Sequence, residues 1–146
     1  MSNRIKMNQI DPAAYKAVMG MENYVMASGL KTTHRELIKI RASQINGCAY
    51  CLNMHTVDAR KAGETEQRIY TLSAWRDTPF FDEEERAILA LTEEMTLISQ
   101  HGVSDAVYAK AAELFDATYL SQIMMSIITI NAWNRIAVTL QFEPGK

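Results

Sequence analysis

The chain has 146 residues, of which 48% are hydrophobic and 22% are charged, and its formal net charge is −2. This length fits one domain over residues 1–146 with a sizeable apolar core. The slightly acidic charge argues against nucleic-acid binding, which usually requires a basic excess. The first residues, MSNRIKMNQIDPAAYKAV, contain no apolar stretch long enough for a signal peptide, so we expect a cytoplasmic protein.

The sequence predicts an all-α fold. Its three prolines and six glycines fall between candidate helices, and period-two alternation of apolar and polar residues is missing. In chain order, we expect helices over about residues 12–28, 33–46, 48–61, 64–75, 83–99, 105–115 and 118–140. Asp11, Asp82 and Ser104 are the predicted N-caps of the first, fifth and sixth helices. Thr32 or Thr33 is expected to cap the second.

The last predicted helix carries no charged residue from Ala117 to Asn134. We considered a membrane span, but polar residues interrupt the apolar run too often for one. A helix that is apolar almost all round is buried on most sides. In so small a protein, neighbouring subunits can provide that cover, so we expect a closed, symmetric homo-oligomer.

The segment Ile45 to His55, INGCAYCLNMH, contains the only two cysteines of the chain. If a helix begins at Cys48, the thiols of Cys48 and Cys51 share one face, and His55 lies on that face one turn further on. Unpaired N–H groups and the dipole at a helix start stabilise a thiolate, so this setting favours a nucleophilic, oxidisable pair. A disulfide between residues so close is more readily reduced than a structural one, as a turnover catalyst requires.

Three other interpretations of the cysteine pair stay open at this point. A closed zinc site needs four ligands, and His34 and His101 are the only other histidines, so we expect no bound metal. Two buried cysteines beside a core histidine would carry no chemistry. A thioredoxin-like fold is disfavoured, because its Cys-x-x-Cys follows a strand, and the segment before Cys48 is predicted to be helical.

The spacing Glu36-x11-Cys48-x2-Cys51-x3-His55 resembles the signature of the alkylhydroperoxidase AhpD core, in the carboxymuconolactone decarboxylase-like superfamily. The resemblance continues through DARKAG (58–63), ERAILALTEEMT (85–96) and NAWNR (131–135), and it covers most of the chain from about Leu30. It implies an all-α helical bundle assembled into trimers or hexamers. It also implies a thiol peroxidase without a bound cofactor, which reduces hydroperoxides and is re-reduced by an external dithiol, a lipoylated protein in the best-known members.

The resemblance also implies roles for single residues. Glu36 and His55 belong to the proton relay around the thiols, Cys51 faces the external reductant, and Cys48 lies deeper. Which cysteine attacks the peroxide stays open. From the residues alone, Glu36 either points inward, where burial raises its pKa and lets it accept a thiol proton, or completes a capping box with Thr33. With the motif, we expect the inward position.

One position departs from the family pattern. The best-studied peroxidase members carry a second histidine just before the second cysteine, where this chain has Tyr50. A phenol can donate a hydrogen bond but is a poor base at neutral pH. We therefore predict that Tyr50 tunes the site without being essential, and that the proton relay is shorter or passes through water.

The remaining candidate residues are assigned structural roles. Trp133, Asn134 and Arg135 are expected in packing and subunit contacts, and His34 and His101 at the surface or as caps. Two functions compete with hydroperoxide reduction. One is decarboxylation of a γ-carboxymuconolactone-like lactone acid, against which the cysteine pair counts. The other is non-catalytic redox sensing through the same disulfide.

Overall fold

The computed structural model describes residues 3–145, and over these residues the chain is helical without a β-strand. The predicted all-α fold is therefore confirmed. The helices, in chain order, are α1 (Met7–Ile10), α2 (Pro12–Ala27), α3 (Thr32–Asn46), α4 (Ala49–Lys61), α5 (Glu66–Thr71), the 3₁₀ helix η1 (Leu72–Asp77), α6 (Glu83–Thr96), α7 (Ile98–His101), α8 (Asp105–Leu114) and α9 (Ala117–Leu140).

Side-chain caps fix the helix starts that the sequence marks most clearly. Asp11 Oδ1 accepts a hydrogen bond from the Ala14 N–H at the start of α2. Asp82 and Glu85 form a reciprocal capping box at the start of α6, and Ser104 caps α8. All three predicted N-caps are confirmed, and each satisfies an N–H that the first turn of a helix leaves unpaired.

Three predicted boundaries are wrong. Helix α3 has Lys31 at its N-cap, without a side-chain hydrogen bond, so neither threonine caps it. The helix expected over residues 64–75 is divided into α5 and η1, and the one expected over 83–99 ends at Thr96 and is followed by α7. Single residues with non-helical backbone angles interrupt the helical path, Ala74 (φ −117°, ψ 30°) inside η1 and Leu97 (φ −98°, ψ 31°) after α6.

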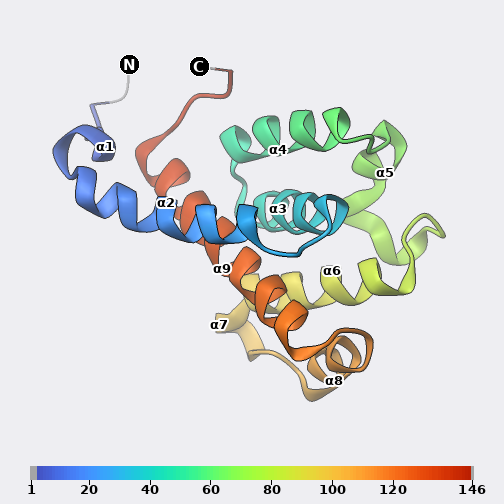
Figure 1. Ribbon diagram of the computed structural model, residues 1–146. Helices are drawn as coiled ribbons and strands as arrows, with labels where there is room; N and C mark the ends of the chain where they lie inside the picture. The colour runs from blue at the N-terminus through green and yellow to red at the C-terminus, as the bar shows by residue number, and fades with distance from the viewer. Residues whose placement is uncertain (1–2, 146) are drawn as a thin grey trace.

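Helix α3 lies at the centre of the fold (Figure 1). It packs against α4, α6 and α9, and α2 packs against α9 beside it. Eight of its residues are buried, and they include the charged Glu36 and Lys39. A helix covered on several sides must find partners for such side chains on its neighbours, because an unpaired buried polar group is costly.

Two apolar clusters fill the interior. The larger lies between α2, α3, α6, α8, α9 and the start of α4, and it includes both cysteines: Val25, Leu30, Ile38, Ala42, Cys48, Cys51, Ile88, Leu91, Ala111, Leu120, Ile123, Ile127, Ile130 and Ala137. The smaller lies where α3, α4 and α6 meet η1: Leu37, Ile40, Ala59, Leu72, Trp75, Phe81 and Leu89. The cysteine pair is therefore anchored in the main core, on a rigid base.

A ladder of polar side chains joins α9 to α3 inside this core. Asn134 Nδ2 donates to Ser43 Oγ (3.0 Å), and Asn134 Oδ1 accepts from Asn46 Nδ2 (2.9 Å). Asn46 also donates to Asn131 Oδ1, and Asn131 donates to Thr96 Oγ1 on α6, both at 3.0 Å. Asn134 is buried, in agreement with its predicted packing role.

His34 lies in the interior, so its predicted surface position is wrong. Its side chain is buried on α3, and Nδ1 lies 2.8 Å from the Tyr119 hydroxyl of α9. The rings of Phe115 and Tyr119 both pack edge-on against the imidazole. His101, at the end of α7, is exposed as expected.

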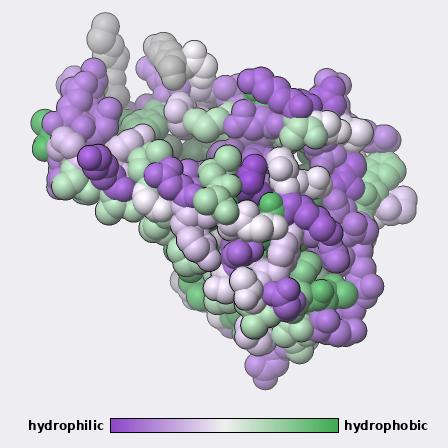
Figure 2. All heavy atoms as spheres, in the orientation of Figure 1, coloured by the Kyte–Doolittle hydropathy of each residue, from purple (hydrophilic) through white to green (hydrophobic). Residues whose placement is uncertain are grey.

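Helix α9 is the one helix in the described part of the chain that is long and apolar enough to cross a membrane, a test that core helices of soluble proteins also pass. It packs against α2, α3, α4, α6 and α8. Its outer side stays partly open, with Ile128 and Val138 exposed. On the face seen in Figure 2, hydrophilic and apolar residues are interspersed. Helix α9 is thus a core helix with one uncovered side.

The polar ladder predicts a specific loss of stability. Asn134→Ala removes two buried hydrogen bonds and leaves a cavity, so it should lower the free energy of unfolding by roughly 2–3 kcal/mol. The neighbouring Arg135 is exposed on the same helix, and Arg135→Ala should cost less than about 1 kcal/mol. Urea unfolding followed by far-UV circular dichroism measures both. Equal effects of the two substitutions would contradict the ladder's role.

Candidate active site

The turn between α3 and α4 places both sulfurs at one helix start. Gly47 adopts a left-handed conformation (φ 64°, ψ 35°), which glycine reaches without steric cost. The chain then reverses, and the Cys48 N–H donates to Ser43 O (3.0 Å) on the last turn of α3. Cys48 is the N-cap of α4, and its Sγ accepts the Cys51 N–H at 3.3 Å. The predicted helix start is confirmed.

Cys48 and Cys51 form a disulfide, with their Cα atoms 5.3 Å apart. Both are buried, Cys48 with 1% and Cys51 with 3% of its surface exposed. Over residues 3–145, no group of three or more His, Cys, Asp and Glu side chains is placed to hold a metal ion. The disulfide therefore joins two cysteines three residues apart at the start of α4.

Glu36 of α3 and His55 of α4 face each other, and His55 shares a pocket wall with Cys51. Their nearest atoms, Glu36 Oε2 and His55 Nδ1, lie 3.3 Å apart, and neither atom has another hydrogen-bond partner. Both side chains are buried, with 6% and 9% of the residue exposed. Glu36 therefore points inward as the motif suggested, and the alternative capping box with Thr33 does not form.

The pKa of the Glu36 carboxyl differs from the predicted one. Burial acts to raise the pKa of this carboxyl, but His55, Lys39 and Arg35 together outweigh burial and hold the pKa below its ordinary value of 4.5. Arg35 Nε lies 3.5 Å from Glu36 Oε1 on the side away from His55. The predicted rise is therefore wrong: Arg35 and Lys39 are neighbours of Glu36 in the chain, but the fold adds His55 and turns all three toward the carboxyl. Glu36 is a fixed negative charge at neutral pH.

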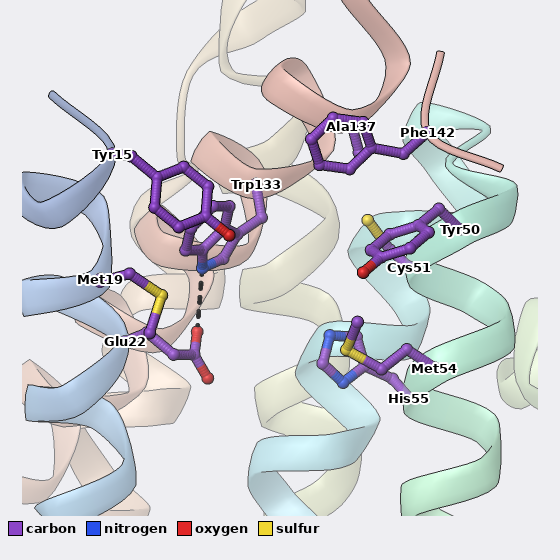
Figure 3. A pocket seen from close by; sticks show the side chains of 10 residues that line it. All are labelled: Tyr15, Met19, Glu22, Tyr50, Cys51, Met54, His55, Trp133, Ala137 and Phe142. Atoms are coloured by element: carbon purple, nitrogen blue, oxygen red, sulfur yellow. Dashed lines mark hydrogen bonds between the residues drawn. The ribbon is translucent and has the colours of Figure 1, made fainter. Parts of the chain in front are cut away.

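A pocket of about 240 Å³ opens onto one sulfur (Figure 3). Cys51 and His55 lie in its wall, together with Tyr50 and Met54 of the same helix. Side chains of α2, of α9 and of the segment after α9 form the rest: Tyr15, Met19, Glu22, Trp133, Ala137 and Phe142. Cys48 is not among the lining residues, so Cys51 is the sulfur that a molecule in the pocket would meet.

Tyr50 stands in the pocket wall next to Cys51. Its ring packs edge-on against Phe142, with the ring centroids 5.3 Å apart. This contact orients the phenol and connects α4 to the segment after α9. The position fits a side chain that shapes access to the sulfur.

Sequence reasoning missed the part of the pocket that α2 supplies. Glu22, Tyr15 and Met19 carry no motif and lie far from the cysteines in the chain. Trp133 was assigned to packing, yet its Nε1 donates to Glu22 Oε2 (3.1 Å) inside the pocket. One signal was available, since Lys39 interrupts the apolar run Leu-Ile-Lys-Ile at positions 37–40. A lysine within a buried helix face predicts a buried counter-ion.

An all-α domain with a Cys-x-x-Cys disulfide at a helix start, beside a buried Glu–His pair, defines the class of AhpD-like proteins. The model of the carboxymuconolactone decarboxylase family matches residues 12–94, and the chain belongs to this family.

Comparisons with single proteins are consistent with this family assignment. The chain is 47% identical over 140 residues to the uncharacterised protein YdfG of Bacillus subtilis, covering 96% of this chain and 95% of that one. ATU0492 of Agrobacterium tumefaciens, of unknown function and proposed to be the antioxidant defence protein AhpD, is 40% identical. Its structure covers 100% of this chain and 99% of its own, with a TM-score of 0.95. An alkylhydroperoxidase AhpD core structure from Ralstonia eutropha JMP134 shares the fold, at 20% identity and a TM-score of 0.82 over 96% and 75%.

The lowered pKa of Glu36 predicts how its contribution to stability depends on pH. A carboxyl whose folded pKa lies below its unfolded value stabilises the fold fully above about 4.5, and this contribution is lost as the pH falls through the folded pKa. The difference in unfolding free energy between wild type and Glu36→Gln should therefore be constant near neutral pH and shrink below about pH 4.5. Urea unfolding from pH 7 to pH 3 measures it.

The exposed Glu113 of α8 provides the matched control, because Glu113→Gln removes a carboxylate without touching the site. A Glu36→Gln difference that grew on acidification would mean that burial, and not the surrounding cations, dominates the pKa of Glu36.

Proposed function

We propose that the protein is a thiol-dependent hydroperoxide reductase that cycles Cys48 and Cys51 between dithiol and disulfide. One observation carries the proposal: Cys51 of the disulfide lies in the wall of a mostly apolar pocket together with His55, whose imidazole meets the buried carboxylate of Glu36. A reactive sulfur, a proton carrier and a dry pocket for an organic molecule are the three parts that such a reaction needs.

In the first step, the Cys51 thiolate attacks the outer oxygen of a hydroperoxide. The O–O bond breaks, the sulfur becomes a sulfenic acid, and the alkoxide leaves and takes up a proton to form the alcohol. Cys51 is the attacking sulfur in this proposal because it lines the pocket, whereas Cys48 does not. His55 lies in the same wall and is the group placed to supply that proton.

In the second step, the Cys48 thiol condenses with the sulfenic acid, which forms the disulfide and releases water. An external dithiol, such as a lipoylated protein, then attacks Cys51 Sγ from the pocket side, and Cys48 leaves as a thiolate. The start of α4 favours this leaving group, because the Cys51 N–H already points at Cys48 Sγ and the helix dipole stabilises a negative charge there. No bound cofactor takes part.

Glu36 acts through His55 in this scheme. With its low pKa, Glu36 remains ionised, and its carboxylate lies 3.3 Å from His55 Nδ1, where it holds the imidazole in place while His55 accepts a thiol proton. The carboxylate is thus a positioning residue and the imidazole carries the proton.

The two competing functions fit these features less well. Loss of carbon dioxide from a lactone acid changes no sulfur oxidation state, so the disulfide would have no part in a decarboxylase. A redox sensor would use the same disulfide but needs no pocket in front of it.

We also propose that the protein is a homo-oligomer, a trimer or hexamer, in which the open side of α9 with Ile128 and Val138 is covered.

Single cysteine variants test the assignment of roles. After one equivalent of cumene hydroperoxide, Cys48→Ser should accumulate a sulfenic acid on Cys51, while Cys51→Ser should not form one on Cys48. Mass spectrometry after dimedone labelling reads this out. Both variants should lose turnover with dithiothreitol, because neither can close the disulfide. The appearance of sulfenic acid on neither cysteine would contradict the proposed function.

The role of Tyr50 is tested by removing its hydroxyl. Tyr50→Phe keeps the ring contact with Phe142 and should lower peroxide turnover by less than about tenfold, below the roughly 100-fold or greater loss typical of a missing acid or base. His55→Asn gives the comparison for a lost proton carrier. A Tyr50→Phe protein without measurable activity would show that the phenol is essential.

A further inference from the structure

Lys39 is a buried cation that the proposed reaction does not use. It lies in the middle of α3 with 2% of its surface exposed. An ammonium in such a place is costly unless an opposite charge meets it. Its Nζ donates to Glu22 Oε1 of α2 at 2.5 Å, which satisfies that requirement.

Glu22, the counter-ion of Lys39, is itself part of the pocket wall. It lines the wall opposite Cys51 and His55 (Figure 3), and its side chain is 19% exposed. Its two oxygens are held separately, Oε1 by Lys39 and Oε2 by the Trp133 indole N–H at 3.1 Å. The carboxylate is thereby fixed in one orientation by a cation behind it and a neutral donor beside it.

The same lysine shares a buried face of α3 with a second carboxylate, that of Glu36. Lys39 follows Glu36 by three positions, so both occupy one face of α3, and both are buried. The charged groups around Glu36 are His55 from α4, Arg35 and Lys39 from its own helix, and Glu22 from α2 through Lys39. Helix α9 adds only the neutral indole of Trp133 to this group.

We infer that Lys39 is a positioning residue of the disulfide site, and that Glu22 is its counter-ion. The buried ammonium links the carboxylate on the pocket wall to the one beside His55, so the charge of Glu22 is felt at Glu36. The electrostatic link holds whatever reaction the site performs, whereas its catalytic meaning rests on the proposed function. A ligand whose O–H or N–H group binds Glu22 would act on the Glu36–His55 pair through Lys39.

Two substitutions should shift the pKa of Glu36 in opposite directions. Lys39→Met keeps an unbranched side chain one atom shorter but removes a positive charge, which should raise the pKa of Glu36. Glu22→Gln leaves the ammonium without its counter-ion, which should strengthen the positive field and lower the pKa of Glu36 further. A purely structural role would loosen the site in both variants and would not produce opposite signs.

The measurement is a ¹³C NMR titration of glutamate side-chain carboxyls in the disulfide form, in which neither sulfur titrates. The resonance of Glu36 is identified by its absence in Glu36→Gln. Lys39→Arg retains the cation and should restore the wild-type midpoint. Trp133→Phe removes only a neutral donor from Glu22 and should leave the midpoint unchanged. Circular dichroism confirms that each variant is folded.

Opposite shifts support the inference, whereas unchanged midpoints or shifts of the same sign overturn it. If Lys39→Met does not fold, Glu22→Gln against Trp133→Phe decides the question, because a downward shift is then required in the first and not in the second. Peroxide turnover is assayed separately. Its absence in the wild type would count against the proposed function without changing the titration result.

Discussion

The burial of a charged and polar face on helix α3 is the constraint on which the rest of the structure depends. Each polar side chain on this covered helix would destabilise the fold without a partner. Three neighbouring helices supply those partners: Glu22 of α2, His55 of α4 and Asn134 of α9. The contacts that satisfy α3 therefore also fix where α2, α4 and α9 lie, and the pocket is the space left between these three helices.

The packing of α2, α4 and α9 against the polar face of α3 explains why the disulfide and the charged pairs lie close together. The cysteines follow α3 directly, and the left-handed turn at Gly47 folds α4 back along it. His55, two turns into α4, is thereby carried back beside Glu36. The disulfide is anchored in the apolar core, while the charges lie between helices that are already packed.

Because its pKa is lowered, Glu36 is a fixed negative charge in this site and not a base at neutral pH. A buried carboxyl is expected to be a base when burial dominates, but His55, Lys39 and Arg35 together reverse that balance here. The site holds its charges in pairs, Glu36 with His55 and Arg35, and Lys39 with Glu22. Paired charges keep a buried site stable, and they also connect its parts, since a change in one partner alters the field at the next.

The sequence by itself determined the all-α fold, most helix starts and the position of the cysteine pair at a helix start, because caps, helical periodicity and the spacing of Glu36, Cys48, Cys51 and His55 are local signals. Only the tertiary structure decided what surrounds them. Glu22 of α2 meets Lys39 of α3, and Tyr119 of α9 meets His34 of α3. Such contacts join residues distant in the chain, and no local pattern encodes which side chains will share a buried space.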